Sequence, residues 1–272
     1  MRDLKLKACQ IRQGVLQLIH EAKTGHIGGD MSVTDILVDL YYKQMNVSPE
    51  GMQDPDRDRF VLSKGHSVEA LYTILADKGV FPKDELKTYS QYGSKFIGHP
   101  NNKINGIEMN TGSLGHGLSV GVGMAMAGKM DKRDYRVYVV MGDGEMAEGS
   151  VWEAIMAAGH YKLDNITAFV DRNRLQISGT TEQVMSQDSQ EQRWASFGWN
   201  VLSIPGNDME AIDAAVQLSK ETKGKPTVII ANTTKGCGVS FMENQAGWHH
   251  RVPTDEEFAQ GMKELKEKEA AL

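Results

Sequence analysis

Short, strand-like apolar runs alternate along this chain with longer stretches whose apolar residues recur at helical spacing. Period-two or continuous apolar runs predict strands, and recurrence at three and four positions predicts helices. Strands are expected at 59–63, 135–142, 199–204, 227–231 and just ahead of 171. Helices are expected at 4–22, from 32 to about 41, from 66 to about 78, and at 113–129, 187–197, 208–222 and 254–269. This alternation predicts an α/β fold with a mainly parallel sheet and helices on both faces.

Glycine and polar clusters separate these elements. The glycine-rich segment 25–30 is expected to be a turn, 49–58 a polar loop, and 89–112 a long loop with little periodicity. Long loops inside compact domains are often functional. Large α/β sheets often exceed the usual domain size, so residues 1–272 are expected to form a single domain.

The segment 135–177 contains two of the strand-like runs with one helical stretch between them. A crossover helix between parallel strands brings the carboxyl ends of both strands to one edge of the sheet. The first strand ends with Asp143 between two glycines, and the second leads into Asn173. Open α/β sheets bind their ligands at this edge. We therefore expect Asp143 and Asn173 to lie close together in a binding site.

A carboxylate and a carboxamide oxygen at this edge suit a hard cation such as Mg²⁺. Gly144 is expected to leave its backbone N–H free for a phosphate oxygen, and the N-terminus of the following helix adds partial positive charge. The segment therefore predicts a site for a metal-bridged diphosphate. The alternative interpretation is a glycine turn in which Asp143 is an ordinary helix N-cap.

Composition and charge narrow the class of protein. The net charge is −6, the sequence pI is near 5.8 and the basic residues are scattered, which argues against a nucleic-acid binder. Cys9 and Cys237 form neither a disulfide framework nor a metal-ligand pattern, which favours a reducing compartment. No stretch approaches the length of a membrane span, and the N-terminus has a charged helical pattern. The expected location is therefore the cytoplasm.

Four of the eight histidines lie in loops that this topology directs to the edge carrying Asp143. They are His26 in TGHIGG, His66 in SKGHS, His99 in GHP and His249 in GWHH. A single histidine is more often a solvated or hydrogen-bonded side chain, but four at one edge indicate proton transfer near neutral pH. His250 follows His249 directly, which leaves two candidates for the imidazole of the last loop.

Together these features resemble the transketolase family. GDG, a spacer of 28 residues and then Asn after a second strand is similar to the thiamine-diphosphate motif. GDGEMAEGSVWEA, NTGSLGHGLS and FVLSKGH are similar to transketolase segments, and the resemblance runs from about residue 10 to 252. The chain departs from the family at Ile27, where Pro is frequent, and at His116, where Gln is frequent.

The resemblance implies a role for each matching residue. Asp143, Asn173 and the backbone carbonyl of Leu175 would hold Mg²⁺, or Ca²⁺ or Mn²⁺, for the cofactor thiamine diphosphate. The implied cofactor contacts are His66, Gly112, Ser113, Leu114, Asp143, Gly144, Asn173, Lys235 and His249. The residues implied to contact the ketose and relay protons are His26, His99 and His249. Glu148 and Glu153 resemble an acidic pair at a subunit contact.

The resemblance also implies an activity and a partner. Full-length transketolases continue into a pyrimidine-binding domain and a third C-terminal domain, and no part of residues 1–272 resembles either. We therefore expect the diphosphate-binding subunit of a split transketolase, completed by a separate C-terminal subunit in an α₂β₂ assembly. That enzyme would transfer a two-carbon ketol unit from a ketose phosphate or sulfonate to an aldose. The alternatives are a deoxyxylulose-phosphate-synthase-like condensation, a Mg²⁺-dependent phosphate enzyme and a non-catalytic paralogue that binds thiamine diphosphate.

Overall fold

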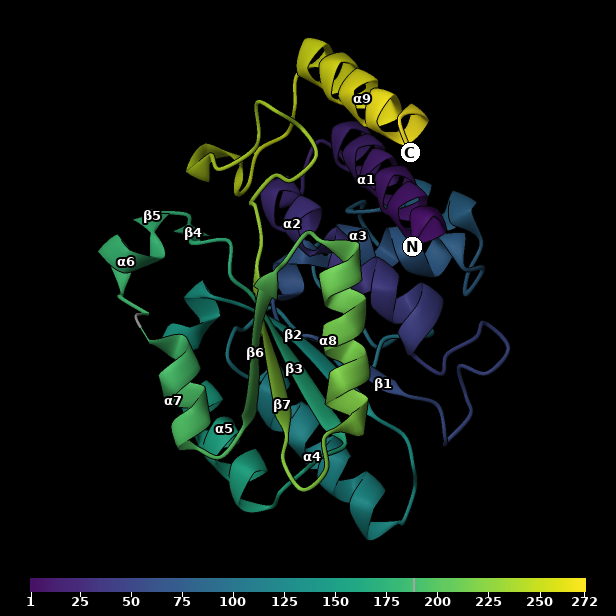
Figure 1. The fold of residues 1–272 in the computed structure, drawn as a ribbon. Coiled ribbons are helices and arrows are strands. Elements are labelled where there is room, and N and C mark those ends of the chain that lie inside the picture. The colour runs from purple at the N-terminus through teal and green to yellow at the C-terminus, as the bar shows by residue number, and fades with distance from the viewer. Residues whose placement is uncertain (188) are drawn as a thin grey trace.

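A parallel sheet forms the centre of the computed structural model, which describes residues 1–187 and 189–272 (Figure 1). Its strands are β1 (Arg59–Leu62), β2 (Val137–Gly142), β3 (Ile166–Asp171), β6 (Asn200–Pro205) and β7 (Thr227–Asn232). Within the described ranges they pair in the order β1-β2-β3-β7-β6, and each pairing is parallel. The three central strands are almost entirely buried, as expected for a sheet that is covered on both faces.

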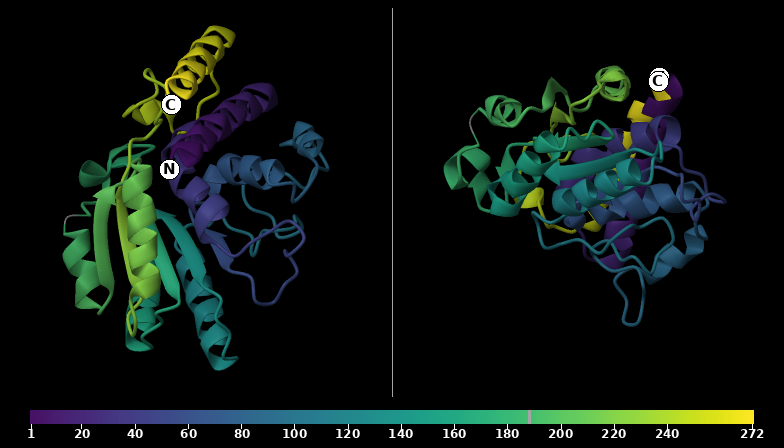
Figure 2. Two further views of the ribbon diagram at one scale, coloured as in Figure 1. Left: turned by 45° about the vertical axis from the view of Figure 1, so that its right-hand side comes forward. Right: turned by 90° about the horizontal axis from the view of Figure 1, so that it is seen from below.

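Helices cover both faces of this sheet (Figure 2). On one side lie α2 (Ile27–Asp39), α3 (Val68–Asp77) and α8 (Met209–Glu221), and on the other lie α4 (Gly117–Met130), α5 (Gly149–His160) and α7 (Gln190–Ser196). Two further helices lie outside this layer, because α1 (Arg2–Ala22) packs on α2 and α3, and α9 (Asp255–Ala270) packs on α1. Successive side chains of a strand point to opposite faces. In β2, Tyr138 therefore packs into the first core, and its neighbours Val137 and Val139 pack into the second.

The predicted α/β fold with a mainly parallel sheet is confirmed. The boundaries of β1, β7, α1 and α8 agree with their predicted ranges to within about two residues. The last helix, predicted at 254–269, begins with a capping box, in which the side chain of Thr254 accepts from the amide of Glu257 and the Glu257 side chain accepts from the amide of Thr254. The helix predicted at 187–197 corresponds to α7, and position 188 of that range lies outside the described residues.

The glycine-rich segment 25–30 is not the turn that its composition predicts. The helix α2 already begins at Ile27. A Cβ on Gly28 would lie 2.6 Å from the carbonyl oxygen of Trp248, so a side chain there would collide with the loop after β7. Glycine is needed here for close packing between a helix and a distant loop, which local composition does not reveal.

Two further features near the sheet edge depart from the predictions. The helix expected from residue 113 begins only at Gly117, so 113–116 remain part of the preceding loop. After β3 the chain forms an unpredicted hairpin of β4 (Leu175–Gln176) and β5 (Gly179–Thr180), followed by the short helix α6 (Thr181–Val184). Both departures shape the edge at which β1, β2, β3 and β7 end.

Candidate cofactor-binding site

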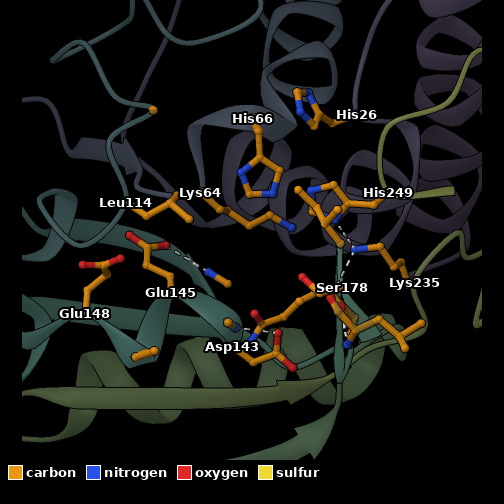
Figure 3. Close-up of a pocket in the computed structure, with 18 residues that line it drawn as sticks. His26, Lys64, His66, Leu114, Asp143, Glu145, Glu148, Ser178, Lys235 and His249 are labelled. Carbon is orange, nitrogen blue, oxygen red and sulfur yellow. Dashed lines mark hydrogen bonds between the residues drawn. The ribbon is translucent and has the colours of Figure 1, made fainter. Parts of the chain in front are cut away.

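A cavity of about 440 Å³ lies at the carboxyl edge of the sheet, among the segments that follow β1, β2, β3 and β7 (Figure 3). The predicted site residues that line it are His26, His66, Gly112, Leu114, Asp143, Gly144, Asn173, Leu175, Lys235 and His249. The parallel topology thus brings together residues from both ends of the sequence. Figure 3 shows the imidazoles and Lys235 on one side of this cavity and the acidic residues on the other.

Ser113 and His99, which the resemblance also implies, do not line this cavity. Ser113 is exposed, and its neighbour Leu114 lies against the cavity instead. His99 lies one layer further out, with its ring centroid 6.2 Å from that of His26. Gly112, at a φ of 134°, passes so close to His99 that a Cβ would lie 2.7 Å from the imidazole. His99 therefore supports the Gly112 loop from behind.

Asp143 is buried at the end of β2 and accepts two backbone hydrogen bonds. Its Oδ1 accepts from the N–H of Gly144 at 2.9 Å, and its Oδ2 accepts from the N–H of Arg174 at 2.6 Å. The expectation that the Gly144 N–H would be free is therefore wrong, because the neighbouring carboxylate engages it. The pKa of Asp143 is raised to about 6, mainly by burial and secondly by the negative charge of the nearby Asp171. A cation at this carboxylate would offset that cost.

The other predicted ligands offer neutral oxygens. The side-chain oxygen of Asn173 accepts from the N–H of Leu175 at 3.1 Å, and the carbonyl oxygen of Leu175 faces Lys235 at 3.4 Å. In the described parts of the chain, no three His, Cys, Asp or Glu side chains group as a metal site. One carboxylate and two neutral oxygens suit Mg²⁺ or Ca²⁺, which retain coordination positions for water and phosphate. The donor set therefore fits a metal that is shared with a diphosphate.

Lys235 is buried rather than solvated, with 1% of its surface exposed. Its Nζ lies 3.0 Å from Nδ1 of His249. Burial, together with the charge of Lys64, lowers the pKa of Lys235 to about 8. The His249 ring stacks on that of His66, with centroids 5.3 Å apart. This geometry identifies His249, rather than His250, as the imidazole of this loop that lines the cavity.

The imidazoles that line the cavity are kept neutral. Burial lowers the pKa of His26 to about 4 and that of His249 to about 3, and it lowers the pKa of His66 well below its usual range. Neighbouring imidazoles and the ammonium groups of Lys64 and Lys235 act in the same direction. A neutral imidazole has a ring nitrogen that can accept a proton. These pKa values make His26 and His249 weaker bases than is ideal for the proton transfer near neutral pH that the sequence predicts.

Sequence reasoning missed an ion pair at the wall of the cavity, which Lys64 lines. Lys64 and Asp171 are both buried and form a short salt bridge between the ends of β1 and β3. Asp171 also accepts from the hydroxyls of Ser32 at 2.7 Å and of Thr233, so the pair joins α2 to the sheet. Lys64 stands in the SKGHS segment that carries His66, but its partner lies 107 positions away along the chain, so the sequence gives no signal for the pairing.

Glu145 is a second missed residue. It is buried, it lines the cavity, and its Oε1 accepts from the hydroxyl of Ser63 and from the N–H of Gly115 at 2.8 Å. Its Oε2 accepts from the N–H of Gly142 at 3.2 Å. Glu145 therefore fastens the Gly112–Gly115 loop to the end of β2. No periodicity in the sequence signals this role.

A partly apolar surface faces outward beside the site. In α4, Val120 is 36% exposed and Gly123 has open space around its Cα, and in α5, Met156 is 56% exposed. Glu148 and Glu153 are exposed on the same side of the molecule, at the beginning of α5.

In the described ranges no helix is long and apolar enough to cross a bilayer.

Comparison with known proteins gives one family. The family model described as transketolase, thiamine diphosphate binding domain, matches residues 5–268. The chain is 52% identical over 268 residues to an apulose-4-phosphate transketolase subunit of Phocaeicola vulgatus, covering 98% of this chain and 95% of that protein. It is 42% identical over 270 residues to 6-deoxy-6-sulfo-D-fructose transketolase subunit SqwG of Clostridium sp. (strain MSTE9), covering 99% and 98%.

Comparison with solved structures points to the same family. Transketolase from Leishmania mexicana superimposes with a TM-score of 0.90 at 29% identity, covering 97% of this chain and 41% of that chain. Transketolase from Campylobacter jejuni gives a TM-score of 0.91 at 30% identity, covering 97% and 43%. The chain thus spans about two fifths of these longer transketolases, and nearly the whole length of the relatives that are named as subunits.

Proposed function

The chain belongs to the transketolase family, and from that premise we propose that it is the thiamine-diphosphate-binding subunit of an enzyme that transfers a two-carbon ketol unit. The observation that carries this proposal is the convergence of three oxygen donors, of Asp143, Asn173 and Leu175, with Lys235 and His249 in one cavity. The buried Asp143 carboxylate has no ion-pair partner among the described residues, which supports its role as a metal ligand.

The residues that line the cavity have two roles, cofactor binding and proton transfer. Asp143, Asn173 and the Leu175 carbonyl would hold Mg²⁺ for the diphosphate end of the cofactor, and the ammonium of Lys235 would add positive charge at the same end. When bound, thiamine diphosphate supplies the nucleophilic carbon and the electron sink that allow a ketose to be cleaved next to its carbonyl carbon. His26 and His249 accept and return protons at the ketose hydroxyls, because their rings are neutral and line the cavity.

We infer that residues 1–272 form a single diphosphate-binding domain and that a separate chain supplies the pyrimidine-binding and C-terminal domains. Two observations support this inference. The two apulose-4-phosphate transketolase subunits, of Phocaeicola vulgatus and Actinobacillus succinogenes, are matched over 95% and 96% of their own length. The α4–α5 face, with Val120, Gly123 and Met156, is apolar and exposed as a subunit contact requires. We propose an α₂β₂ assembly in which Glu148 and Glu153 lie at subunit contacts.

The substrate class follows from the chemistry of the relatives. Their names specify one donor with a phosphate and one with a sulfonate at the end of the sugar. We propose a ketose that carries such an anionic terminal group, read mostly by the partner subunit. We also propose a cytoplasmic location, which the free thiols of Cys9 and Cys237 support.

The test begins with the isolated chain and the product of its neighbouring gene. The chain alone should bind thiamine diphosphate weakly and transfer no ketol unit, whereas the assembled complex should do both with Mg²⁺ present. In the complex, Asp143→Ala should weaken cofactor affinity by about 100-fold or more, because the diphosphate loses its bridging charge. Asp134→Ala, at an exposed carboxylate away from the cavity, is the matched control.

Calorimetry measures the cofactor affinity, and a coupled assay measures transfer from a ketose phosphate or sulfonate to an aldose phosphate. Wild-type affinity in Asp143→Ala would overturn the metal assignment. Robust turnover by the isolated chain would overturn the two-subunit proposal. Cofactor binding without any transfer by the complex would favour the non-catalytic alternative.

A further inference from the structure

Two consecutive histidines in the segment after β7 make different contacts. His249 lines the cavity and lies 3.0 Å from Lys235. His250 is exposed, and its ring centroid lies 4.5 Å from that of His26, with the two rings inclined at 65°. The other imidazoles that contact His26 are further away, at centroid distances of 5.3 to 6.2 Å. His250 is therefore the nearest imidazole to His26 among the ring contacts that the structure describes.

The position of His250 is set by its neighbours along the chain. Trp248 is buried, and its carbonyl oxygen packs against Gly28 at the beginning of α2. The guanidinium of Arg251 lies 4.1 Å from the centroid of the Trp248 ring and pairs with Glu257 of α9 at 2.5 Å. A histidine between two anchored residues loses little further conformational entropy when it contacts His26.

The surroundings of His26 oppose a positive charge on its ring. His26 is half-buried, and its Nδ1 has no hydrogen-bond partner within the described residues. The charged and titratable groups that face it are His66, His99, His249, His250, Lys64 and Lys235, together with Glu69, which accepts from its backbone N–H. Burial lowers the pKa of His26 most, and the charge of His250 is the next cause.

We propose that His250 is a positioning residue, which holds the ring of His26 in place beside the cavity and adds to the surroundings that oppose a positive charge there. Edge-on contact between two rings restricts rotation of the inner one. A neutral His26 accepts a proton from a substrate hydroxyl, whereas the cationic form has no acceptor. The catalytic consequence rests on the proposed ketol transfer, but the contact and its effect on His26 do not.

The first measurement is independent of catalysis. The full-length chain, labelled in its histidines, is titrated by NMR, with His26 assigned by the His26→Ala variant. His250→Ala and His250→Gln should both raise the titration midpoint of His26 by about one pH unit, since each removes a neighbouring like charge. His160→Ala, at an exposed histidine at the end of α5, should leave the midpoint unchanged. His250 and His160 are exposed, so the variants at these two positions should unfold at the wild-type temperature.

The second measurement separates orientation from charge in the assembled complex. His250→Ala should raise KM for the ketose several-fold, because His26 loses the ring that packs against it, while cofactor affinity stays at the wild-type level. His250→Gln preserves much of this packing and should restore KM, but the acid limb of kcat/KM should remain shifted to higher pH. A His26 midpoint and a pH profile that match wild type in both variants would overturn the inference. If the wild-type complex transfers no ketol unit, the proposed function fails, and the NMR titration still decides the role of His250.

Discussion

Replacing Lys64 by methionine should destabilise the chain strongly, because the change leaves a buried carboxylate without its counter-charge. Lys64 and its partner Asp171 are 1% and 0% exposed. Asp171 retains hydrogen bonds from the hydroxyls of Ser32 and Thr233 in the variant, whereas the ammonium is lost. The ion pair joins the ends of β1 and β3 to the first turns of α2, so its loss affects the elements that carry His26 and His66.

The size of the stability loss in Lys64→Met follows from the burial of the ion pair. Removing one partner of a buried ion pair costs about 3–5 kcal/mol. Since two hydroxyl donors remain at Asp171, we expect the lower end of this range, about 3 kcal/mol. A folded domain of ordinary stability has about 5–15 kcal/mol, so Lys64→Met should remain folded but lose a large share of its stability.

The loss should depend on pH in a defined direction. Burial alone would raise the pKa of Asp171, but Lys64 holds it below its usual range. The wild-type pair therefore stabilises the fold at neutral pH, and this contribution is lost only as the pH falls through that depressed pKa. In Lys64→Met only the two hydroxyl donors oppose the effect of burial, so we expect Asp171 to take up a proton above its unfolded pKa of about 3.9. The deficit relative to wild type should be smaller at pH 5 than at pH 8.

Urea unfolding of the cofactor-free chain at both pH values tests this reasoning. The slope m should stay constant, which shows that the same surface is exposed on unfolding. Lys64→Met/Asp171→Asn should recover much of the loss, because the buried group is then neutral and its carbonyl oxygen still accepts from one of the two hydroxyls, of Ser32 or of Thr233. Lys87→Met, in the exposed pair with Asp84, is the control and should leave the midpoint unchanged. A deficit below about 1 kcal/mol at pH 8, or an equal deficit at both pH values, would refute the argument.

Three further predictions concern the same chain. Glu145→Gln keeps one acceptor oxygen, so the side chain can no longer accept from both Gly115 and Gly142 and the link between the loop and β2 is broken. Calorimetry should then show about tenfold lower cofactor affinity of the complex, and unchanged affinity would show that the Gly112–Gly115 loop needs no such anchor. Gly65→Ala would place a Cβ 2.8 Å from the amide nitrogen of Gly112 and should destabilise the chain by about 1–3 kcal/mol in thermal unfolding. Its control, Gly123→Ala in open space, should stabilise by about 0.5–1 kcal/mol, and equal effects of both would contradict the packing argument. Burial raises the pKa of Asp39 to about 7, so the buried carboxylate is charged, and costs stability, only at high pH. Asp39→Asn should therefore stabilise the chain by at most about 4 kcal/mol above pH 7 and not at all below pH 4. A pH-independent effect in urea unfolding would be inconsistent with a buried charge.

The sequence by itself determined the fold class and the chemistry at the end of β2. Strand and helix periodicities are local properties of the chain, so β1, β7 and α8 were predictable within about two residues. The spacing of Asp143 and Asn173 within one βαβ unit is local in the same sense, and parallel pairing of β2 with β3 then brings the two side chains to one edge. The histidine loops were predictable as a group, because each follows or precedes an element that ends at that edge.

Only the tertiary structure decided which of these side chains enter the cavity. His249 and His250 are adjacent in sequence, and their different contacts depend on Lys235 and His26, which lie in other segments. The pairing of Lys64 with Asp171 spans 107 positions, and the need for glycine at Gly28 comes from the distant backbone of Trp248. Such contacts arise when separate elements pack to high density, and local periodicity carries no information about them.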